Sequence, residues 1–323
     1  MGFWLARKIQ YNYVAAGGML MKLLRMISFV SLMLGAGVCL ADETVIATDI
    51  LGPEGPLVIE GKLYFVAWEG YQLIRMDGDK KTVINSDKKC SQNGLALTQK
   101  NTLLLACDSE PGAIIETDLN GQEIRRWEQD ADGHPMAGGV NDIVVTKNGG
   151  AYATLTGPGG PQAPVVGKIL YLAPGSSQWT LVADYLNHAN GVAISPDQKT
   201  LYVTETFGNT IKKFNISDNG SLTDRANFAF LNLLTNDATK SIALGPDSMK
   251  IDRTGNIYVA QWKGSKILKI SPEGVLLHQF DIASGDGTTN VAFDADEKYM
   301  YVTVVKDTTD PKYTGSVVRI PKI

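Results

Sequence analysis

Beyond residue 42, the apolar and polar positions of the chain repeat one unit of short strands and show almost no helical periodicity. Each unit opens on a polar residue and an apolar run, then has a turn and a second apolar run that ends near a small residue. One such unit consists of the strand Asn190–Ile194, the turn Ser195–Lys199 and the strand Leu201–Thr204. A third strand follows each pair. The pattern predicts antiparallel strands joined by hairpins, and therefore an all-β fold.

The unit occurs six times, and its opening residues recur at intervals of about 40 to 57 positions. This period predicts a six-bladed β-propeller with a central channel. The edges of the blades have to be covered, so we expect the strand Thr44–Ala47 to join the last blade beside the C-terminal strand. The six opening residues are Glu54, Asn93, Asn141, Asn190, Asp247 and Asn290.

The opening residues are candidate metal ligands, because the first strand of each propeller blade lines the channel and all six carry a side-chain oxygen. A ring of oxygens without thiolate or imidazole favours Ca²⁺, with Mg²⁺ and Mn²⁺ as alternatives, over Zn²⁺. The carboxylates of Glu54 and Asp247 would balance the charge of a divalent cation. Turn chemistry is the competing explanation, since Asn and Asp are common where strands begin, but it explains one or two copies rather than six.

Four short motifs recur at the starts of predicted inner strands: Glu54-Gly-Pro, Val140-Asn-Asp, Asn190-Gly and Pro246-Asp-Ser-Met. In their order and spacing they resemble the senescence-marker protein/gluconolactonase/luciferin-regenerating-enzyme-like family, over roughly residues 45 to 320. The resemblance implies a metal held by Glu54, Asn190 and Asp247, with Asn141 as a further ligand or a substrate contact. It also implies hydrolysis of a lactone or another ester.

The sequence departs from the sugar-lactone members of that family at two places. Gly139 stands where those members carry an arginine, and Thr156–Pro161 replaces the stretch in which they carry a glutamate. Both departures remove the polar clamp for a sugar lactone. They argue against gluconolactone itself as the substrate and leave the metal chemistry intact.

Three residues are candidates for catalysis of ester hydrolysis, in which the cation would polarise the carbonyl and stabilise the oxyanion. Asp247 is expected to act either as a general base toward water or as a nucleophile. His134 and His188 precede Asn141 and Asn190 and are expected on loops at the channel mouth, where an imidazole can shuttle protons. The alternative for both histidines is a polar loop residue or a contact in the pocket wall.

The remaining candidates are substrate contacts. Asn93 and Asn290 complete the ring of oxygens, and Trp68 and Trp262 follow second strands, where they can wall a pocket with apolar surface. Packing between blades is the alternative for the tryptophans.

Composition agrees with a folded domain that acts on a small molecule. Hydrophobic residues make up 44% of the 323 positions and charged residues 20%, which favours a packed core. The net charge is −4 and basic residues do not cluster, so nucleic acid is not an expected partner. The expected partner is a lactone or ester. One alternative is a non-catalytic propeller that binds a ligand or a partner protein, and another is a lyase acting on a cyclic ester. The carboxylates of Glu54 and Asp247 favour metal chemistry over the non-catalytic alternative, because a binding scaffold does not need converging charges in its channel.

The first 41 residues are expected to be an N-terminal extension and a signal peptide, followed by a propeller domain at 42–323. Met21–Arg25 is basic, Met26–Val38 is apolar, and cleavage is expected after Ala41. The apolar run is short for a membrane anchor, the alternative, since a bilayer core is about 30 Å thick. We therefore expect an exported protein, periplasmic or secreted, without stable membrane insertion after cleavage.

Two cysteines, Cys90 and Cys107, remain after cleavage of this signal. An oxidising compartment would allow them to pair, and two buried free thiols are the alternative.

Overall fold

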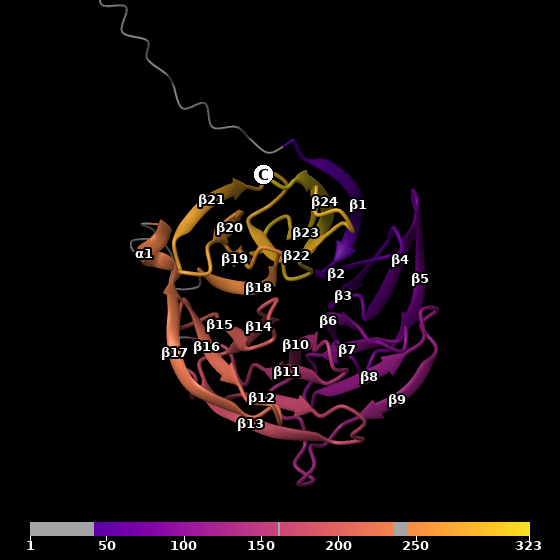
Figure 1. The fold of residues 1–323 in the computed structure, drawn as a ribbon. Helices are drawn as coiled ribbons and strands as arrows, with labels where there is room; N and C mark the ends of the chain where they lie inside the picture. The colour runs from indigo at the N-terminus through magenta and orange to yellow at the C-terminus, as the bar shows by residue number, and fades with distance from the viewer. Residues whose placement is uncertain (1–41, 161, 236–243) are drawn as a thin grey trace, which may run out of the picture. The chain divides into compact units, whose positions relative to one another are not determined.

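The computed structural model describes residues 42–160, 162–235 and 244–323, so the predicted signal segment lies outside the described residues. Within these ranges, 24 strands form six four-stranded antiparallel sheets. Figure 1 shows the sheets arranged around a common axis, which confirms the predicted six-bladed propeller. The one helix of the described residues, α1 (Leu231–Thr235), follows an outer strand. Among the same described residues, no helix has the length and apolarity that crossing a bilayer requires.

The first three blades follow the chain in order, each with its first strand innermost (Figure 1). The first blade comprises β2 (Pro53–Ile59), β3 (Lys62–Ala67), β4 (Gln72–Asp77) and β5 (Lys80–Ser86). The second comprises β6 (Gln92–Leu97), β7 (Leu103–Cys107), β8 (Ala113–Thr117) and β9 (Glu123–Trp127). The third comprises β10 (Val140–Val145), β11 (Ala151–Leu155), β12 (Gly167–Leu172) and β13 (Trp179–Leu186).

The last three blades continue the ring, and the sixth is assembled from both ends of the domain. The fourth blade comprises β14 (Ala189–Ile194), β15 (Thr200–Glu205), β16 (Thr210–Ile216) and β17 (Leu222–Phe230). The fifth comprises β18 (Gly245–Ile251), β19 (Ile257–Trp262), β20 (Lys266–Ile270) and β21 (Leu276–Asp281). The sixth comprises β1 (Thr44–Leu51), β24 (Thr314–Pro321), β23 (Tyr299–Val305) and β22 (Gly287–Phe293).

The ring closes where β1 pairs antiparallel with β24, with Thr44 opposite Arg319. This pairing confirms the expected position of the Thr44–Ala47 strand. Next to the closure, the ammonium group of Lys322 lies 3.2 Å from a carboxylate oxygen of Asp252 and 2.9 Å from one of Glu297. The C-terminal end is therefore tied by charge to a turn of the fifth blade as well as by hydrogen bonds to the sixth.

The core consists of six apolar clusters, each lying between two neighbouring blades. Second strands are buried along almost their whole length because both of their faces meet an adjacent blade. Tyr152 of the third blade, for example, packs with Leu201 and Val203 of the fourth. The rigid ring that results holds the ends of the inner strands in fixed relative positions.

A disulfide joins Cys90 to Cys107 within the second blade, which decides between the two alternatives left by the sequence. Both sulfurs are inaccessible to solvent, and the loop they close spans 17 positions. Cys107 ends β7, so the bond anchors the point at which the following loop, beginning with Asp108, leaves the blade.

Candidate metal and substrate site

The same irregularity occurs in every inner strand at the segment of its opening residue. In all six blades the pairing of the first and second strands shifts register at the segment that carries the opening residue. Such bulges re-aim side chains and end regular pairing. Near Glu54, for instance, the shift lies between Glu54 and Leu57.

The glycine that follows several opening residues allows adjacent inner strands to approach closely. A Cβ atom on Gly191 would lie 2.5 Å from the Cα of Ser248 and 2.8 Å from the carbonyl oxygen of Asp247. A Cβ on Gly94 would lie 2.6 Å from the Cα of Asp142. The Asn-Gly motifs therefore combine an oxygen ligand with the absence of a side chain that would separate the blades.

Threonines at the ends of second strands fix the backbone of the next blade. The hydroxyl of Thr154 donates a hydrogen bond to the carbonyl of Asn190, and that of Thr204 donates to the carbonyl of Asp247 at 2.7 Å. All of these groups are buried or nearly so, where hydrogen bonds hold geometry most firmly. The backbone of two opening residues is thus set by neighbouring blades rather than by a flexible loop.

The four predicted metal ligands line a single cavity at one end of the inner strands. This central cavity has a volume of about 430 Å³, within the range of small-molecule sites. Asn93 lines it as well. The structure therefore brings together groups that are separated by almost 200 positions in the sequence, namely Glu54, Asn141, Asn190 and Asp247.

Three of these residues present a buried oxygen that has no hydrogen-bond partner among the described residues: Oε1 of Glu54, Oδ1 of Asn141 and Oδ1 of Asn190. Buried polar atoms in folded proteins are almost always paired, so three orphaned acceptors in one cavity call for a common electropositive partner. Carboxylate and amide oxygens are the ligands preferred by hard divalent cations. The donor set therefore fits such a cation, with Asp247 as the fourth oxygen-bearing side chain.

The electrostatics of the cavity point the same way. Burial, and then the nearby charge of Asp142, raise the pKa of Glu54 to about 8. Loss of contact with water and the proximity of Glu54 raise the pKa of Asp247 well above its usual range, although a hydrogen bond from Asn190 opposes this. Among the lining residues Lys263 carries a positive charge, and behind the cavity the ammonium group of Lys250 lies 3.7 Å from a carboxylate oxygen of Asp142. Two carboxyl groups with raised pKa values would both be stabilised as anions by a bound cation.

Asn290 supports Glu54 instead of facing the cavity, where the sequence had placed a substrate contact. Its Nδ2 donates to Oε2 of Glu54 at 2.9 Å, and its Oδ1 accepts from the backbone of Val291 at 2.8 Å. The side chain is fully buried and does not line the central cavity. Its amide nitrogen and its amide oxygen both have partners within the protein. Asn290 therefore holds Oε2 of Glu54 in place, while Oε1 of Glu54 remains without a partner among the described residues.

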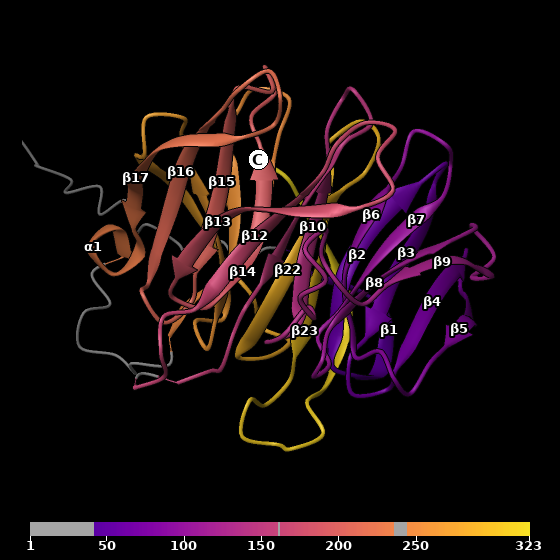
Figure 2. The ribbon, with the colours of Figure 1, turned by 90° about the horizontal axis from the view of Figure 1, so that it is seen from below.

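An aromatic wall closes one side of the central cavity. Trp68 and Trp262 both line it, as expected, together with Tyr313, whose ring centroid lies 5.7 Å from that of Trp68 and 6.1 Å from that of Trp262. Tyr313 comes from the loop between β23 and β24, which projects beyond the strand ends in Figure 2. Sequence reasoning missed it because this loop has no counterpart in the repeat.

His188 also lines the central cavity, in a strained backbone conformation. Its φ of 60° lies in the left-handed region, which is costly for a residue other than glycine. The ring meets Phe207 edge to face at 4.9 Å, and burial lowers its pKa to about 4, so the imidazole is neutral at pH 7. Its buried Nδ1 has no hydrogen-bond partner among the described residues.

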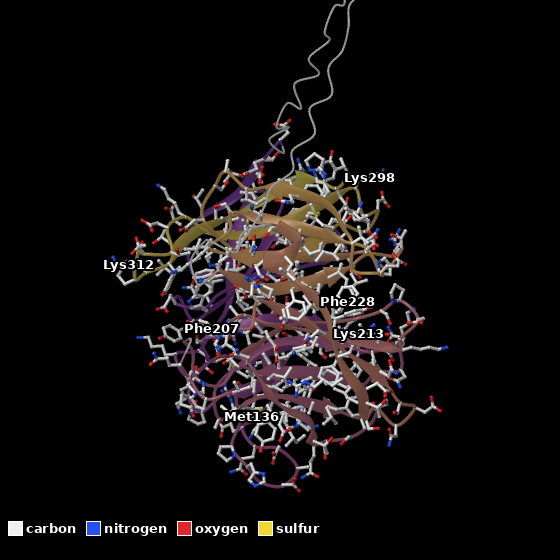
Figure 3. The ribbon with its side chains drawn as sticks, turned by 90° about the vertical axis from the view of Figure 1, so that its left-hand side faces the viewer. Met136, Phe207, Lys213, Phe228, Lys298 and Lys312 are labelled. Atoms are coloured by element: carbon white, nitrogen blue, oxygen red, sulfur yellow. A yellow bond between two sulfur atoms is a disulfide. The ribbon has the colours of Figure 1, made fainter. Side chains whose placement is uncertain are left out.

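The position of Phe207, which contacts His188, shows on which face of the propeller the central cavity lies. Figure 3 views the ring from its side, with Phe207 and Lys312 of the β23–β24 loop toward one face and Lys298 toward the other.

Asp108 lines the central cavity although it was not predicted from the sequence. Burial raises its pKa to about 7, while hydrogen bonds with Asn141 and Thr156 act in the opposite direction. It is the first residue after a second strand, the position that Trp68 occupies in the first blade. Comparison of that position across the repeats, rather than of the opening residues alone, would have found it.

His134 does not reach the central cavity, contrary to its expected place at the channel mouth. It lies on the loop between β9 and β10, with its side chain 69% exposed and Nδ1 3.4 Å from Asp130. Bridges pair Pro135 with Gln129 of the same loop and Met136 with Gly112 before β8, and they flank the segment that carries the histidine at the surface. With Asp132 it forms a loose group of donor atoms that lie within 4.8 Å of one another.

Comparison with known proteins agrees with the fold and identifies the family. The family model described as SMP-30/Gluconolactonase/LRE-like region matches residues 52–306, most of the chain. The chain belongs to this family. Lactonase drp35 of Staphylococcus haemolyticus is 28% identical over 215 residues, covering 65% of this chain and 63% of the relative. The corresponding protein of Staphylococcus saprophyticus is 32% identical over 220 residues, 67% of this chain and 64% of the relative. The match thus spans less than two thirds of these curated relatives.

Solved structures share the fold at lower identity. A gluconolactonase from Xanthomonas campestris superposes with a TM-score of 0.70 at 23% identity, covering 87% of this chain and 89% of that one. A calcium-binding regucalcin from Agrobacterium tumefaciens superposes with a TM-score of 0.71 at 19% identity, covering 87% and 93%. Both likenesses support the architecture of the propeller.

Proposed function

We propose that this protein is a divalent-metal-dependent hydrolase of lactones or related esters, with Ca²⁺ as its most favoured cation. The observation that carries the proposal is the set of three buried, unpartnered oxygens from Glu54, Asn141 and Asn190, which share one cavity with Asp247. The names of the staphylococcal relatives, lactonases, support the reaction class. The calcium-binding regucalcin supports the choice of cation.

Glu54, Asn141, Asn190 and Asp247 would hold the cation. When bound, it would supply a Lewis acid that polarises the lactone carbonyl. The Asp247 carboxylate, less deeply buried than Glu54, is the protein group that would attack the carbonyl or take a proton from water. The free Nδ1 of His188 would accept a hydrogen bond from water or substrate.

The aromatic wall of Trp68, Trp262 and Tyr313 would hold the face of the lactone ring and exclude water from that side.

A panel of lactones and aryl esters, assayed with and without a chelator, tests the proposal. We expect hydrolysis of at least one lactone, loss of the activity on chelation, and its return when Ca²⁺ is added. Activity that ignores chelation would exclude the metal mechanism, and a protein that binds Ca²⁺ but hydrolyses nothing would be a non-catalytic propeller.

Asp247→Asn tests the role of the carboxylate. We expect it to lower kcat by about a hundredfold or more while Ca²⁺ binding, measured by calorimetry, is retained at reduced affinity. Asp296→Asn is the matched control, since its carboxylate is 72% exposed and far from the cavity in the β22–β23 turn. Near wild-type hydrolysis by Asp247→Asn with metal bound would refute the role.

We also propose that the protein is exported and that its signal peptide is cleaved after Ala41. The disulfide between Cys90 and Cys107 supports this, because such bonds persist mainly in oxidising compartments. Fractionation of cells that produce the full chain, with N-terminal sequencing of the product, should find it outside the cytoplasm and beginning at Asp42. A product that retains Met21–Ala41 in the cytoplasm would contradict the proposal.

A further inference from the structure

A second cavity of about 570 Å³ adjoins the central cavity and shares Asp108 and His188 with it. We call it the side groove. Its walls come from the β7–β8 loop, the β9–β10 loop and the β11–β12 loop of the second and third blades. Because two residues line both spaces, the side groove lies beside the proposed metal site, with Asp108 and His188 at the boundary.

Three of the residues that line the side groove are glycines in closely packed backbone. A Cβ atom on Gly139 would lie 1.9 Å from Oδ1 of Asp108, and one on Gly138 would lie 2.6 Å from the Cα of Gly157. All three glycines have φ values between 72° and 90°, in the left-handed region that other residues rarely adopt. These are also the two stretches in which the sequence departs from the sugar-lactone pattern. In place of the polar side chains of the clamp, the side groove is thus lined here by closely packed glycine backbone.

The side groove offers both apolar and polar contacts. Pro158 and Val166 give it apolar surface, while Glu110 and Lys168 bring charges of opposite sign. Glu110 is already engaged, since its Oε2 accepts a hydrogen bond from the backbone of Gly138 at 2.6 Å. A charged substituent would meet a like charge from one of these residues or from Asp108. A neutral group with apolar atoms and hydrogen-bonding atoms meets no such repulsion.

We propose that the preferred substrate is a lactone whose ring lies in the central cavity and carries a neutral, elongated substituent, such as an acylamino chain, in the side groove. This inference rests on the proposed function, because it assigns the reacting ring to the metal site. It explains why a second space lies beside the first and why the clamp for a hydroxyl-rich ring is missing.

Three γ-butyrolactones test the inference: the unsubstituted ring, the ring with a hexanoylamino group and the ring with a carboxylate. We expect kcat/KM to be at least about tenfold higher for the hexanoylamino compound than for either of the others. Val166→Phe should reduce that preference about tenfold by filling the side groove. Val83→Phe is the matched control, because Val83 is 47% exposed on an outer strand and Val166 is 42% exposed; it should keep the wild-type preference.

The corresponding lactams, which resist hydrolysis, separate this inference from the proposed function. Calorimetry should show tighter binding of the hexanoylamino lactam than of the unsubstituted lactam, and Val166→Phe should abolish the difference. If no lactone is hydrolysed but this binding preference appears, the proposed reaction is wrong, while the assignment of the substituent to the side groove is supported. Equal kcat/KM values and equal lactam affinities, or a preference that Val166→Phe leaves intact, would overturn the inference.

Discussion

Replacing Gly191 by alanine should disrupt the metal site without touching any ligand. The new Cβ would lie 2.5 Å from the Cα of Ser248, 2.8 Å from the carbonyl oxygen of Asp247 and 2.9 Å from the amide nitrogen of Met249. All three are backbone atoms, so no side-chain rotation relieves the contacts. Restoring ordinary contact requires β14 and β18 to separate by about 1 Å, a displacement large enough to loosen a binding constellation.

The expected cost of Gly191→Ala is about 3 kcal/mol, the upper end of the range for overpacked cores, because the obstructing atoms belong to the backbone of a neighbouring inner strand. Urea unfolding in the presence of a chelator measures this loss. The same separation should weaken Ca²⁺ binding at least tenfold in calorimetry, since Asn190 and Asp247 lie on the two strands that move apart.

Gly61→Ala is the control for Gly191→Ala. Gly61 lies in the β2–β3 turn with a φ of 77°, and a Cβ atom added there would have no other atom within 4 Å. Alanine at this position should therefore cost about 1 kcal/mol through its backbone conformation alone. Ca²⁺ affinity should then be unchanged. Gly191→Ala protein that binds Ca²⁺ as tightly as the wild type would refute the argument that close strand approach sets the ligand geometry.

Three further predictions concern stability and substrate binding. Joint replacement of Cys90 and Cys107 by alanine should lower the unfolding free energy by about 3 kcal/mol in urea, given a loop of 17 positions; an unchanged midpoint would contradict this. Trp68→Ala should raise KM for a hydrolysed lactone about tenfold with little change in kcat, whereas a fall in kcat alone would argue against a binding role. Lys322→Met should cost about 1 kcal/mol at pH 7 in urea unfolding, and the difference from wild type should vanish in acid.

The pH dependence of the Lys322 effect follows from Asp252. Burial alone would raise the pKa of this carboxyl group, but hydrogen bonds from Thr254, Asn256 and Lys322 lower it to about 2 from an ordinary 3.8. A lowered pKa in the folded state contributes stability above pH 3.8, and that stability is lost as pH falls toward 2. A wild-type advantage that persists at pH 2 would mean that Lys322 stabilises the C-terminus by packing rather than by charge.

Much of the fold could be predicted because each blade repeats the same local signals. Asn190-Gly-Val-Ala-Ile and its counterparts predict inner strands wherever the pattern recurs, and closure by the Thr44–Ala47 strand follows from the need to cover a sheet edge. The ring then dictates that the opening residues converge. Glu54, Asn141, Asn190 and Asp247 could therefore be placed around one cavity from the sequence alone.

The remaining features depend on contacts that break the repeat. Asn290 occupies an equivalent strand position, yet its hydrogen bond to Glu54 uses the side chain that was expected to meet substrate. His134 sits on a loop whose path is set by bridges such as Gly112 to Met136, which no local pattern reports. Tyr313 reaches the cavity from a loop unlike those of the other blades. Loop paths and side-chain partners, unlike strand positions, are decided by tertiary packing.

The central claim, a single divalent cation held by Glu54, Asn141, Asn190 and Asp247, is tested most directly by anomalous diffraction from crystals of the protein grown with Mn²⁺. We predict one strong peak inside the central cavity, within bonding distance of the oxygens that now lack partners. A peak only at the surface group of Asp130, Asp132 and His134, or no peak at all in a fully ordered cavity, would contradict the account.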